Sequence, residues 1–194
     1  LKKDMDTEAR FRRIETVWDP SDRYMVNVDG RNAPGTVSGS KLRAAYQVPV
    51  KWTEGDGSMY LDRTQGTDVK ACDHIFVYQA PSSVTEDRLE KASTIGIASA
   101  LEVIDDLMPL HEADLIAARV VTKGSRRYFE FDCAVAPKSC ASSKDNLGLG
   151  FCPYETIYLV STTAVDDKLV VMVVESDKTE WKLANSDLKR VRSS

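Results

Sequence analysis

The hydrophobic pattern is clearest in the C-terminal third of the chain, where it predicts a set of paired strands. Apolar and polar residues alternate over residues 128–135, which is the period of a strand with one buried face. Residues 169–174 are apolar without interruption and rich in valine, and a strand of that kind needs cover on both faces. A short turn at 165–168 joins this run to residues 156–163 as a hairpin. The pattern therefore predicts an antiparallel sheet, with residues 169–174 as its central strand.

The rest of the chain alternates between strand and helix periods. Strands are expected at residues 46–52, 58–62, 71–78 and 115–121. Two short helices are predicted by the capping boxes Ser83 with Glu86 and Ser99 with Glu102, and a last helix by Asn185-Ser186 before 187–192. Pro49 places the first strand at a sheet edge or ends it. These elements predict an α+β fold in which a central antiparallel β-sheet is sandwiched between helices.

Residues 1–40 differ in composition from the remainder, so we expect an extended N-terminal arm at 1–40 and a globular domain at 41–194. The arm is charged near its start and rich in turn-forming residues near its end. Within it, four apolar residues have the spacing of one face of a short helix that Pro20 would end: Phe11, Ile14, Val17 and Trp18. They predict either an anchor for a partner or a segment that packs on the chain's own domain.

Composition narrows the classes of function. The chain has 194 residues, 42% of them hydrophobic, and a net charge of -4 at pH 7. That length and apolar content suit one domain with a real core, and the acidic balance argues against general nucleic-acid binding. No apolar run is long enough to cross a membrane. The start at Leu1 leaves any targeting segment out of view, so the compartment cannot be read from it.

Four cysteines raise the question of a disulfide: Cys72, Cys133, Cys140 and Cys152. Their spacing fits no zinc motif and contains no Cys-x-x-Cys pair, so zinc and redox roles are not indicated. Cys140 and Cys152 flank a polar loop in which a disulfide would fit if the compartment oxidises thiols. Cys133 with Cys152 is the rival pairing, and free thiols in a reducing compartment are the other alternative.

The sequence offers little for catalysis. Its densest titratable group is His111, Glu112 and Asp114. The carboxylate oxygens in this group suit a hard cation such as calcium or manganese, although the spacing matches no calcium loop. It contains no Gly-x-Ser-x-Gly elbow and no phosphate-cradling glycine loop. We therefore expect a binding protein rather than an enzyme, with no cofactor.

Basic residues gather at three places in an otherwise acidic chain. They are Arg10, Arg12 and Arg13 in the arm, Arg126 and Arg127 at the start of a strand, and Lys182, Lys189, Arg190 and Arg192 near the C-terminus. Local positive patches of this kind indicate docking on an acidic protein surface, while ordinary surface charge is the simpler alternative. Phe11 and Trp18 would add apolar anchors to the arm.

The segments 46–52, 124–131 and 159–169 with Trp181 resemble, in this order, parts of the PsbP domain, a family of extrinsic lumenal proteins of oxygenic photosynthesis. Residues 46–52, with an internal proline and a terminal tryptophan, are similar to the family's opening strand. Residues 124–131 are similar to its glycine-and-tyrosine strand, and residues 159–169 followed by Trp181 look like its closing hairpin. The resemblance covers residues 44–194, and the order of the three segments makes it more specific than any one of them.

The resemblance implies a central antiparallel sheet between helices and residence in the chloroplast thylakoid lumen. It implies a non-enzymatic protein that docks on a photosystem, most directly photosystem II, where the family supports the oxygen-evolving complex and its calcium and chloride retention. The partners would be the photosystem core and other extrinsic lumenal subunits, with the membrane reached only through protein. Ile157 stands where the family has a histidine, so a metal contact by that histidine is not carried over.

Other functions stay open from the sequence. An assembly factor, or a subunit associated with photosystem I, would share the fold and differ in its stoichiometry in a purified complex. A small-ligand-binding protein or enzyme on the same sandwich would need a buried polar pocket with convergent groups. In an oxidising lumen, which only the resemblance implies, the bond between Cys140 and Cys152 becomes the expected disulfide.

Overall fold

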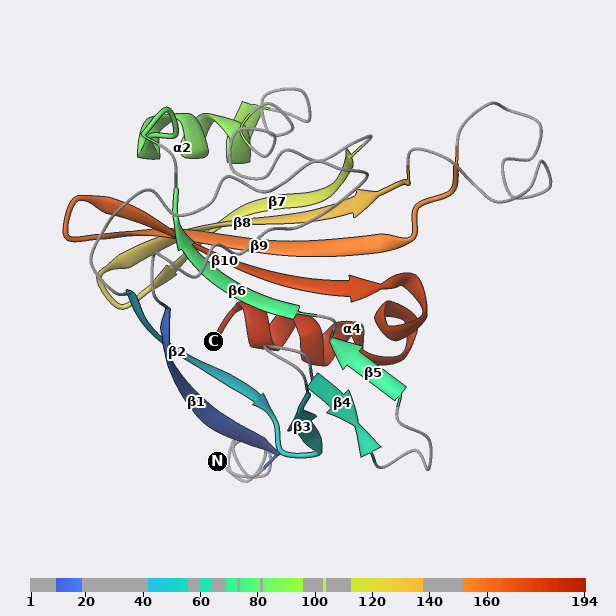
Figure 1. Ribbon diagram of the computed structural model, residues 1–194. Coiled ribbons are helices and arrows are strands. Elements are labelled where there is room, and N and C mark those ends of the chain that lie inside the picture. The colour runs from blue at the N-terminus through green and yellow to red at the C-terminus, as the bar shows by residue number, and fades with distance from the viewer. Residues whose placement is uncertain are drawn as a thin grey trace.

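The computed structural model is built around a five-stranded antiparallel sheet in the order β6-β10-β9-β8-β7 (Figure 1). The strands are β6 (His74–Gln79), β7 (Ala113–Lys123), β8 (Arg126–Val135), β9 (Thr156–Val165) and β10 (Lys168–Asp177). The structure describes residues 10–18, 42–55, 60–63, 69–72, 74–80, 82–95, 103, 113–137 and 152–194. The predicted antiparallel sheet is confirmed, but its middle strand is β9, because β10 lies between β6 and β9.

Two tight turns connect the long strands. Asp166 and Asp167, between β9 and β10, both have positive φ angles, of 48° and 60°. A two-residue turn of this geometry matches the right-handed twist of the strands it joins, and aspartate tolerates it better than most residues do. Gly124, with a φ of 62°, turns β7 into β8 in the left-handed region that glycine adopts without strain. The turns expected from the sequence at these two positions are confirmed.

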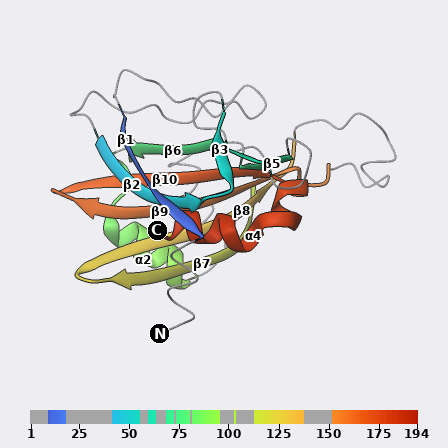
Figure 2. The same ribbon diagram turned by 90° about the horizontal axis from the view of Figure 1, so that it is seen from below.

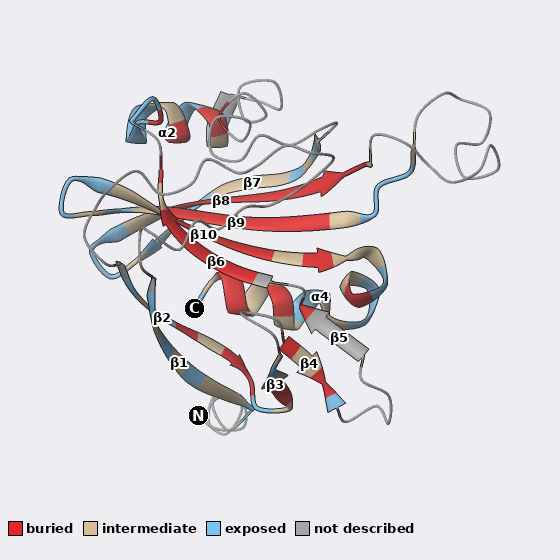
Figure 3. Cartoon of the chain, in the orientation of Figure 1, coloured by how far each residue is buried: buried red, intermediate tan, exposed pale blue. Residues whose placement is uncertain are grey.

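Each face of the sheet carries its own buried cluster and its own helix. Val171 belongs to the cluster under α2 (Glu86–Ile95), and Val174 belongs to the cluster under α4 (Lys178–Arg192). β10 therefore buries residues on both faces, as its uninterrupted apolar run predicts. Figure 3 shows the same for β8 and β9, whose central parts are buried throughout.

The cap of α2 differs from the predicted one. Thr85 Oγ1 accepts a hydrogen bond from the Arg88 N–H at 3.3 Å, so Thr85 caps the helix and the predicted capping box of Ser83 with Glu86 is wrong. The reason is positional, because Thr85 directly precedes the first helical residue and its side chain reaches the third amide of the helix. The second predicted helix start, at Ser99, lies outside the described residues.

The helix α4 begins well before the start predicted for it. The Asp177 side chain accepts hydrogen bonds from the amides of Thr179 at 2.6 Å and Glu180 at 2.8 Å, and Glu180 accepts one from the Asp177 N–H at 3.1 Å. This reciprocal cap starts the helix directly after Asp177. Ala184 leaves helical geometry, so the predicted helix at 187–192 is the second half of a longer, kinked one.

A two-stranded ribbon and a small three-stranded sheet complete the fold on the side of α4. The ribbon is β1 (Phe11–Trp18) paired antiparallel with β2 (Leu42–Pro49), and in Figure 2 it crosses α4. The small sheet is β3 (Trp52–Glu54), β4 (Tyr60–Asp62) and β5 (Val69–Cys72). β2 ends at its proline, which is one of the two alternatives predicted for Pro49. A turn separates it from β3, so the single strand predicted at 46–52 is wrong.

The strand β1 replaces the short helix expected for its apolar residues, and that expectation is wrong. β1 pairs with β2 from Phe11 opposite Pro49 to Trp18 opposite Leu42. Pairing along the whole segment outweighs helical spacing, because a short helix is marginal in water without tertiary contacts. Ile14 packs on the cluster under α4. Part of the predicted arm therefore packs on the chain's own domain, while the boundary at residue 40 stays a prediction.

Val171→Asp should destabilise the fold strongly, because the Val171 side chain is 0% exposed within the cluster under α2. An unpaired carboxylate there should lower the free energy of unfolding by about 3 kcal/mol or more. Val17→Asp is the matched control, since Val17 is a 56% exposed strand residue and its substitution should cost about 0.5 kcal/mol or less. Chemical denaturation measures both, and equal midpoints would contradict the buried position of Val171.

Candidate docking surface

The N-terminal strand and the C-terminal helix meet at one contact. The guanidinium of Arg190, near the end of α4, lies 4.2 Å from the centre of the Phe11 ring at the start of β1. At that distance the cation is attracted to the ring face. The contact joins two segments from opposite ends of the sequence, so two of the three predicted basic groups share one surface.

The cations on this surface differ in their surroundings. Arg10 is exposed, and Arg13 is exposed with an ion pair to Glu15 at 3.0 Å. Lys189 lies over the Trp181 ring, with 5.2 Å between its ammonium and the ring centre. We call this surface the basic face and define it as Arg10, Arg13, Arg43, Lys189 and Arg190.

Two arginines change the set chosen from the sequence. The Arg12 guanidinium donates a hydrogen bond to the Trp52 carbonyl at 3.1 Å, so this side chain joins β1 to β3. Arg43 is exposed on β2, opposite Val17, and sequence reasoning missed it because only the strand pairing brings it beside β1. The side chain of Trp18, the other predicted anchor, lies outside the described residues.

The third basic group divides between the two faces of the sheet. Arg127 forms ion pairs with two carboxylates of α2, Glu90 at 2.8 Å and Glu86 at 3.8 Å, and its hydrogen bond with Glu90 raises the pKa of Arg127. Arg126 is exposed at the turn between β7 and β8. Because consecutive strand residues point to opposite faces, Arg126 lies on the side of α4 and Arg127 on the side of α2.

A buried ion cluster holds the end of α4 against β8. The Arg192 side chain is 0% exposed and donates a hydrogen bond to Asp132 at 2.7 Å, with Glu130 at 3.3 Å. Arg119 of β7, which is 40% exposed, places a second guanidinium 2.8 Å from Glu130. The alternation along β8 predicted a strand with one buried face. That prediction is wrong for the middle of β8, because α4 covers Glu130 and Asp132 on the other face. Arg192 is therefore a buried partner of these carboxylates and does not belong to the basic surface predicted near the C-terminus.

The residues after α4 add hydrogen bonds to the same cluster. Ser193 Oγ donates to Glu130 at 3.0 Å, and the Lys123 ammonium donates to the Ser193 carbonyl. Partial burial lowers the pKa of Lys123, and the charge of Glu130 opposes that shift. Ser194 Oγ accepts a hydrogen bond from the Gln47 N–H at 2.8 Å, so the same segment also holds β2.

A cluster of buried aromatic side chains packs beneath the ribbon of β1 and β2. The hydroxyls of Tyr46 and Tyr60 are 3.1 Å apart and buried, and the Trp52 ring centre lies 6.2 Å from that of Tyr60. Burial, and then the hydrogen bond with Tyr60, raises the pKa of Tyr46, and burial also raises that of Tyr60. Both hydroxyls stay protonated at neutral pH, so this pair contributes packing and a hydrogen bond rather than acid–base chemistry.

The candidate metal ligands are placed only in part. His111 and Glu112 lie outside the described residues, and Asp114 is exposed on β7. Within the described ranges, no three His, Cys, Asp or Glu side chains are grouped so that they could hold a metal ion. The calcium hypothesis for these residues therefore stays a prediction. In the same part of the chain, no helix is long and apolar enough to cross a membrane.

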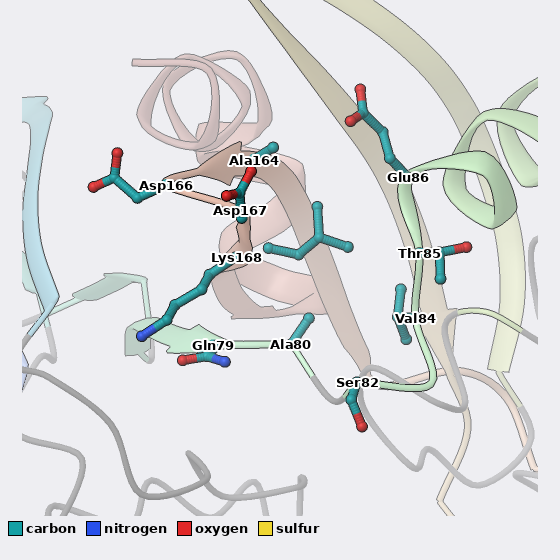
Figure 4. A pocket seen from close by; sticks show the side chains of 11 residues that line it. Gln79, Ala80, Ser82, Val84, Thr85, Glu86, Ala164, Asp166, Asp167 and Lys168 are labelled. Carbon is teal, nitrogen blue, oxygen red and sulfur yellow. The ribbon is translucent and has the colours of Figure 1, made fainter.

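An open hollow of about 710 Å³ lies between the start of α2 and the turn joining β9 to β10 (Figure 4). Three of its lining residues are acidic: Glu86, Asp166 and Asp167. In Figure 4 the side chains of Asp166 and Asp167 point in different directions and Glu86 points away from both. These carboxylates do not converge on one point, so the hollow lends no specific support to a ligand-binding or enzymatic function.

The cysteines separate into thiols and a disulfide. Cys72 and Cys133 are buried thiols, while Cys152 is disulfide-bonded. The rival pairing of Cys133 with Cys152 is therefore wrong, and Cys140 lies outside the described residues. Burial raises the pKa of Cys133 to about 12, and the charge of the adjacent Asp132 contributes to that shift.

Comparison with known proteins finds a likeness among solved structures. No family model matches the sequence, and no curated protein matches it either. Among solved structures, the chain is similar to the solution structure of cyanobacterial PsbP (CyanoP) from Synechocystis sp. PCC 6803. The match has 16% identity and a TM-score of 0.44, and it covers 96% of this chain and 91% of that one. The roles of individual residues therefore rest on the geometry described above.

Cys133 should react with iodoacetamide only after unfolding, because a pKa of about 12 leaves almost no thiolate at neutral pH. Without reduction, alkylation in denaturant should modify Cys72 and Cys133, and peptide mapping should link Cys140 to Cys152. Alkylated Cys152 in unreduced protein would contradict the disulfide.

The free energy of unfolding should also fall as the pH rises above the unfolded thiol pKa of about 8.5, because the unfolded state then loses the Cys133 proton while the folded state keeps it.

Arg192→Met should lower the free energy of unfolding by about 3–5 kcal/mol, because the buried Asp132 would lose its hydrogen-bonded cation and the buried Glu130 one of its two cations. Arg119→Met is the control, since that guanidinium is 40% exposed and its loss leaves Arg192 beside both carboxylates, so this variant should lose less stability than Arg192→Met. Denaturant titration of both variants makes the comparison. Equal losses would show that Arg192 is not the principal partner.

Proposed function

We propose that this protein is a non-enzymatic docking protein that binds the acidic lumenal surface of a photosystem through its basic face. The proposal rests on the cation–π contact between Arg190 and the Phe11 ring, because this contact joins the cations of β1 and α4 into one surface. Exposed cations on one side of a chain with a net charge of -4 favour an acidic partner and a single orientation of approach. The sequence resemblance to the PsbP domain supports the choice of partner.

Photosystem II is the preferred partner, where the protein would support the oxygen-evolving complex and its retention of calcium and chloride. An assembly factor or a photosystem I subunit is the alternative, and stoichiometry in the purified complex separates these roles. The disulfide at Cys152 fits the chloroplast thylakoid lumen as the compartment, since disulfides persist where thiols are oxidised. The membrane would be reached through the photosystem and its other extrinsic subunits.

Substitution tests the basic face better than truncation does. Removing residues 1–18 would delete the strand that pairs with β2 and the Ile14 side chain that packs on the cluster under α4. Docking and folding would then change together. Arg10→Gln combined with Arg13→Gln removes two exposed cations and leaves the strand pairing in place.

The variant Arg10→Gln/Arg13→Gln should rebind thylakoid membranes depleted of extrinsic proteins about five- to tenfold more weakly at low salt. The difference should shrink with added salt, because exposed charges are screened beyond about 8–10 Å at ordinary ionic strength. Lys91→Gln/Lys168→Gln removes the same charge from α2 and the turn between β9 and β10, and it is the matched control. Equal rebinding of the two double variants at every salt concentration would contradict the proposal.

A further inference from the structure

The strand β1 turns one edge of its backbone away from β2. The Val50 N–H donates to the Arg10 carbonyl at 2.9 Å, which makes these two residues a hydrogen-bonded pair of the antiparallel ladder. Hydrogen-bonded and non-hydrogen-bonded pairs alternate along such a ladder. When the register is continued from this pair, the backbone groups that point away from β2 are those of Phe11, Arg13, Glu15 and Val17.

Two features of β2 agree with this assignment of hydrogen-bonded and non-hydrogen-bonded pairs. Pro49 is opposite Phe11 in a non-hydrogen-bonded pair, so the ladder needs no N–H from this proline. The Gln47 N–H, opposite Arg13, leaves the ribbon and donates to Ser194 Oγ at 2.8 Å. The outer edge of β2 is thus partly satisfied by the segment after α4. On the outer edge of β1, no backbone hydrogen bond to another described residue is present.

A hollow with basic and apolar side chains lies on the same ribbon. It has a volume of about 410 Å³, and Arg13, Val17 and Arg43 contribute to its lining. Val17 is 56% exposed, and Thr16 Oγ1, also in the lining, is buried without a hydrogen-bond partner in the described part of the chain. Arg43 is exposed and forms no ion pair with another described residue, and Arg13 is balanced only by the exposed Glu15.

We propose that the edge of β1 accepts an extended, acidic segment of the partner protein as an added strand. This proposal rests on the proposed function and specifies the partner chemistry at the basic face. Hydrogen bonds to the outward backbone groups of β1 supply affinity, and alternate side chains of the added strand supply specificity. A carboxylate of that strand is attracted to Arg13 and Arg43, and an apolar side chain covers Val17.

A second copy of the chain is a poorer occupant of this edge. β1 carries Arg12, Arg13 and one acidic residue, Glu15, so pairing two copies would bring two net positive strands together. An acidic segment has the opposite charge and meets no such repulsion. An unpaired edge strand with an exposed valine is also a surface that a partner strand can cover.

Glu15→Pro and Glu15→Gln separate backbone pairing from charge. The Glu15 N–H points away from β2, so proline removes an outward donor and no hydrogen bond of the ribbon. Glutamine makes the same change in charge and keeps the N–H. The probe is a fluorescent peptide of alternating Asp and Val residues, with an alternating Lys and Val peptide as the charge control. Fluorescence anisotropy with the full chain measures binding.

The Asp–Val peptide should bind the wild-type chain and Glu15→Gln, and Glu15→Pro should weaken that binding at least about fivefold through the lost hydrogen bond. Arg43→Glu provides a second route, because charge reversal at an exposed residue should abolish binding of the Asp–Val peptide without changing the thermal melt. Equal binding to Glu15→Pro and Glu15→Gln, preference for the Lys–Val peptide, or no binding of the Asp–Val peptide would each overturn the proposal.

Failure of this inference differs from failure of the proposed function. If Glu15→Pro and Glu15→Gln rebind depleted membranes equally while Arg10→Gln/Arg13→Gln rebinds weakly, docking stands and strand addition is overturned. If the wild-type chain does not rebind at all, the proposed function itself fails. Sedimentation velocity tests the remaining occupant, since a wild-type dimer that Glu15→Pro dissociates would assign the edge to a second copy and overturn the acidic partner.

Discussion

The buried pairing of Arg192 with Asp132 and Glu130 is the interaction on which the arrangement of the α4 side depends. Apolar contacts such as those of Leu188 are favourable but non-directional, and they would tolerate small shifts of the helix on the sheet. A buried charge is less tolerant, because moving Arg192 away would take the hydrogen-bonded cation from Asp132 and leave Glu130 with only the partly exposed Arg119. The cluster therefore sets the position of α4 as well as contributing to its stability.

The position of α4 in turn decides where the ribbon of β1 and β2 lies. Ser194, two residues beyond Arg192, meets the Gln47 amide of β2, and Arg190 meets the Phe11 ring of β1. Tyr46 and Tyr60, whose buried hydroxyls share a hydrogen bond, pack beneath the ribbon at this point. A disturbance of the ion cluster should therefore reach the basic face through the helix, although no residue of that face belongs to the cluster.

The two sides of the sheet use their cations differently. On the side of α2, Arg127 is compensated by Glu86 and Glu90, so that side presents a largely balanced surface at this point. On the side of α4, Arg10 and Arg43 are exposed, and neither forms an ion pair with another described residue. This difference gives a chain of net negative charge one face suited to an acidic partner, and it gives that partner a preferred orientation.

The sequence by itself determined the elements that depend on neighbours along the chain. The doubly covered run of β10 and the tight turn at Asp166-Asp167 were predictable because residue period and turn chemistry are local properties. The alternation along β8 also predicted a strand, yet it could not show that Glu130 and Asp132 are buried. Their compensating cation, Arg192, lies 60 residues beyond Asp132, and no local pattern specifies that contact. The meeting of Phe11 with Arg190 was likewise decided only by the tertiary structure, because it joins the two ends of the chain through the packing of α4.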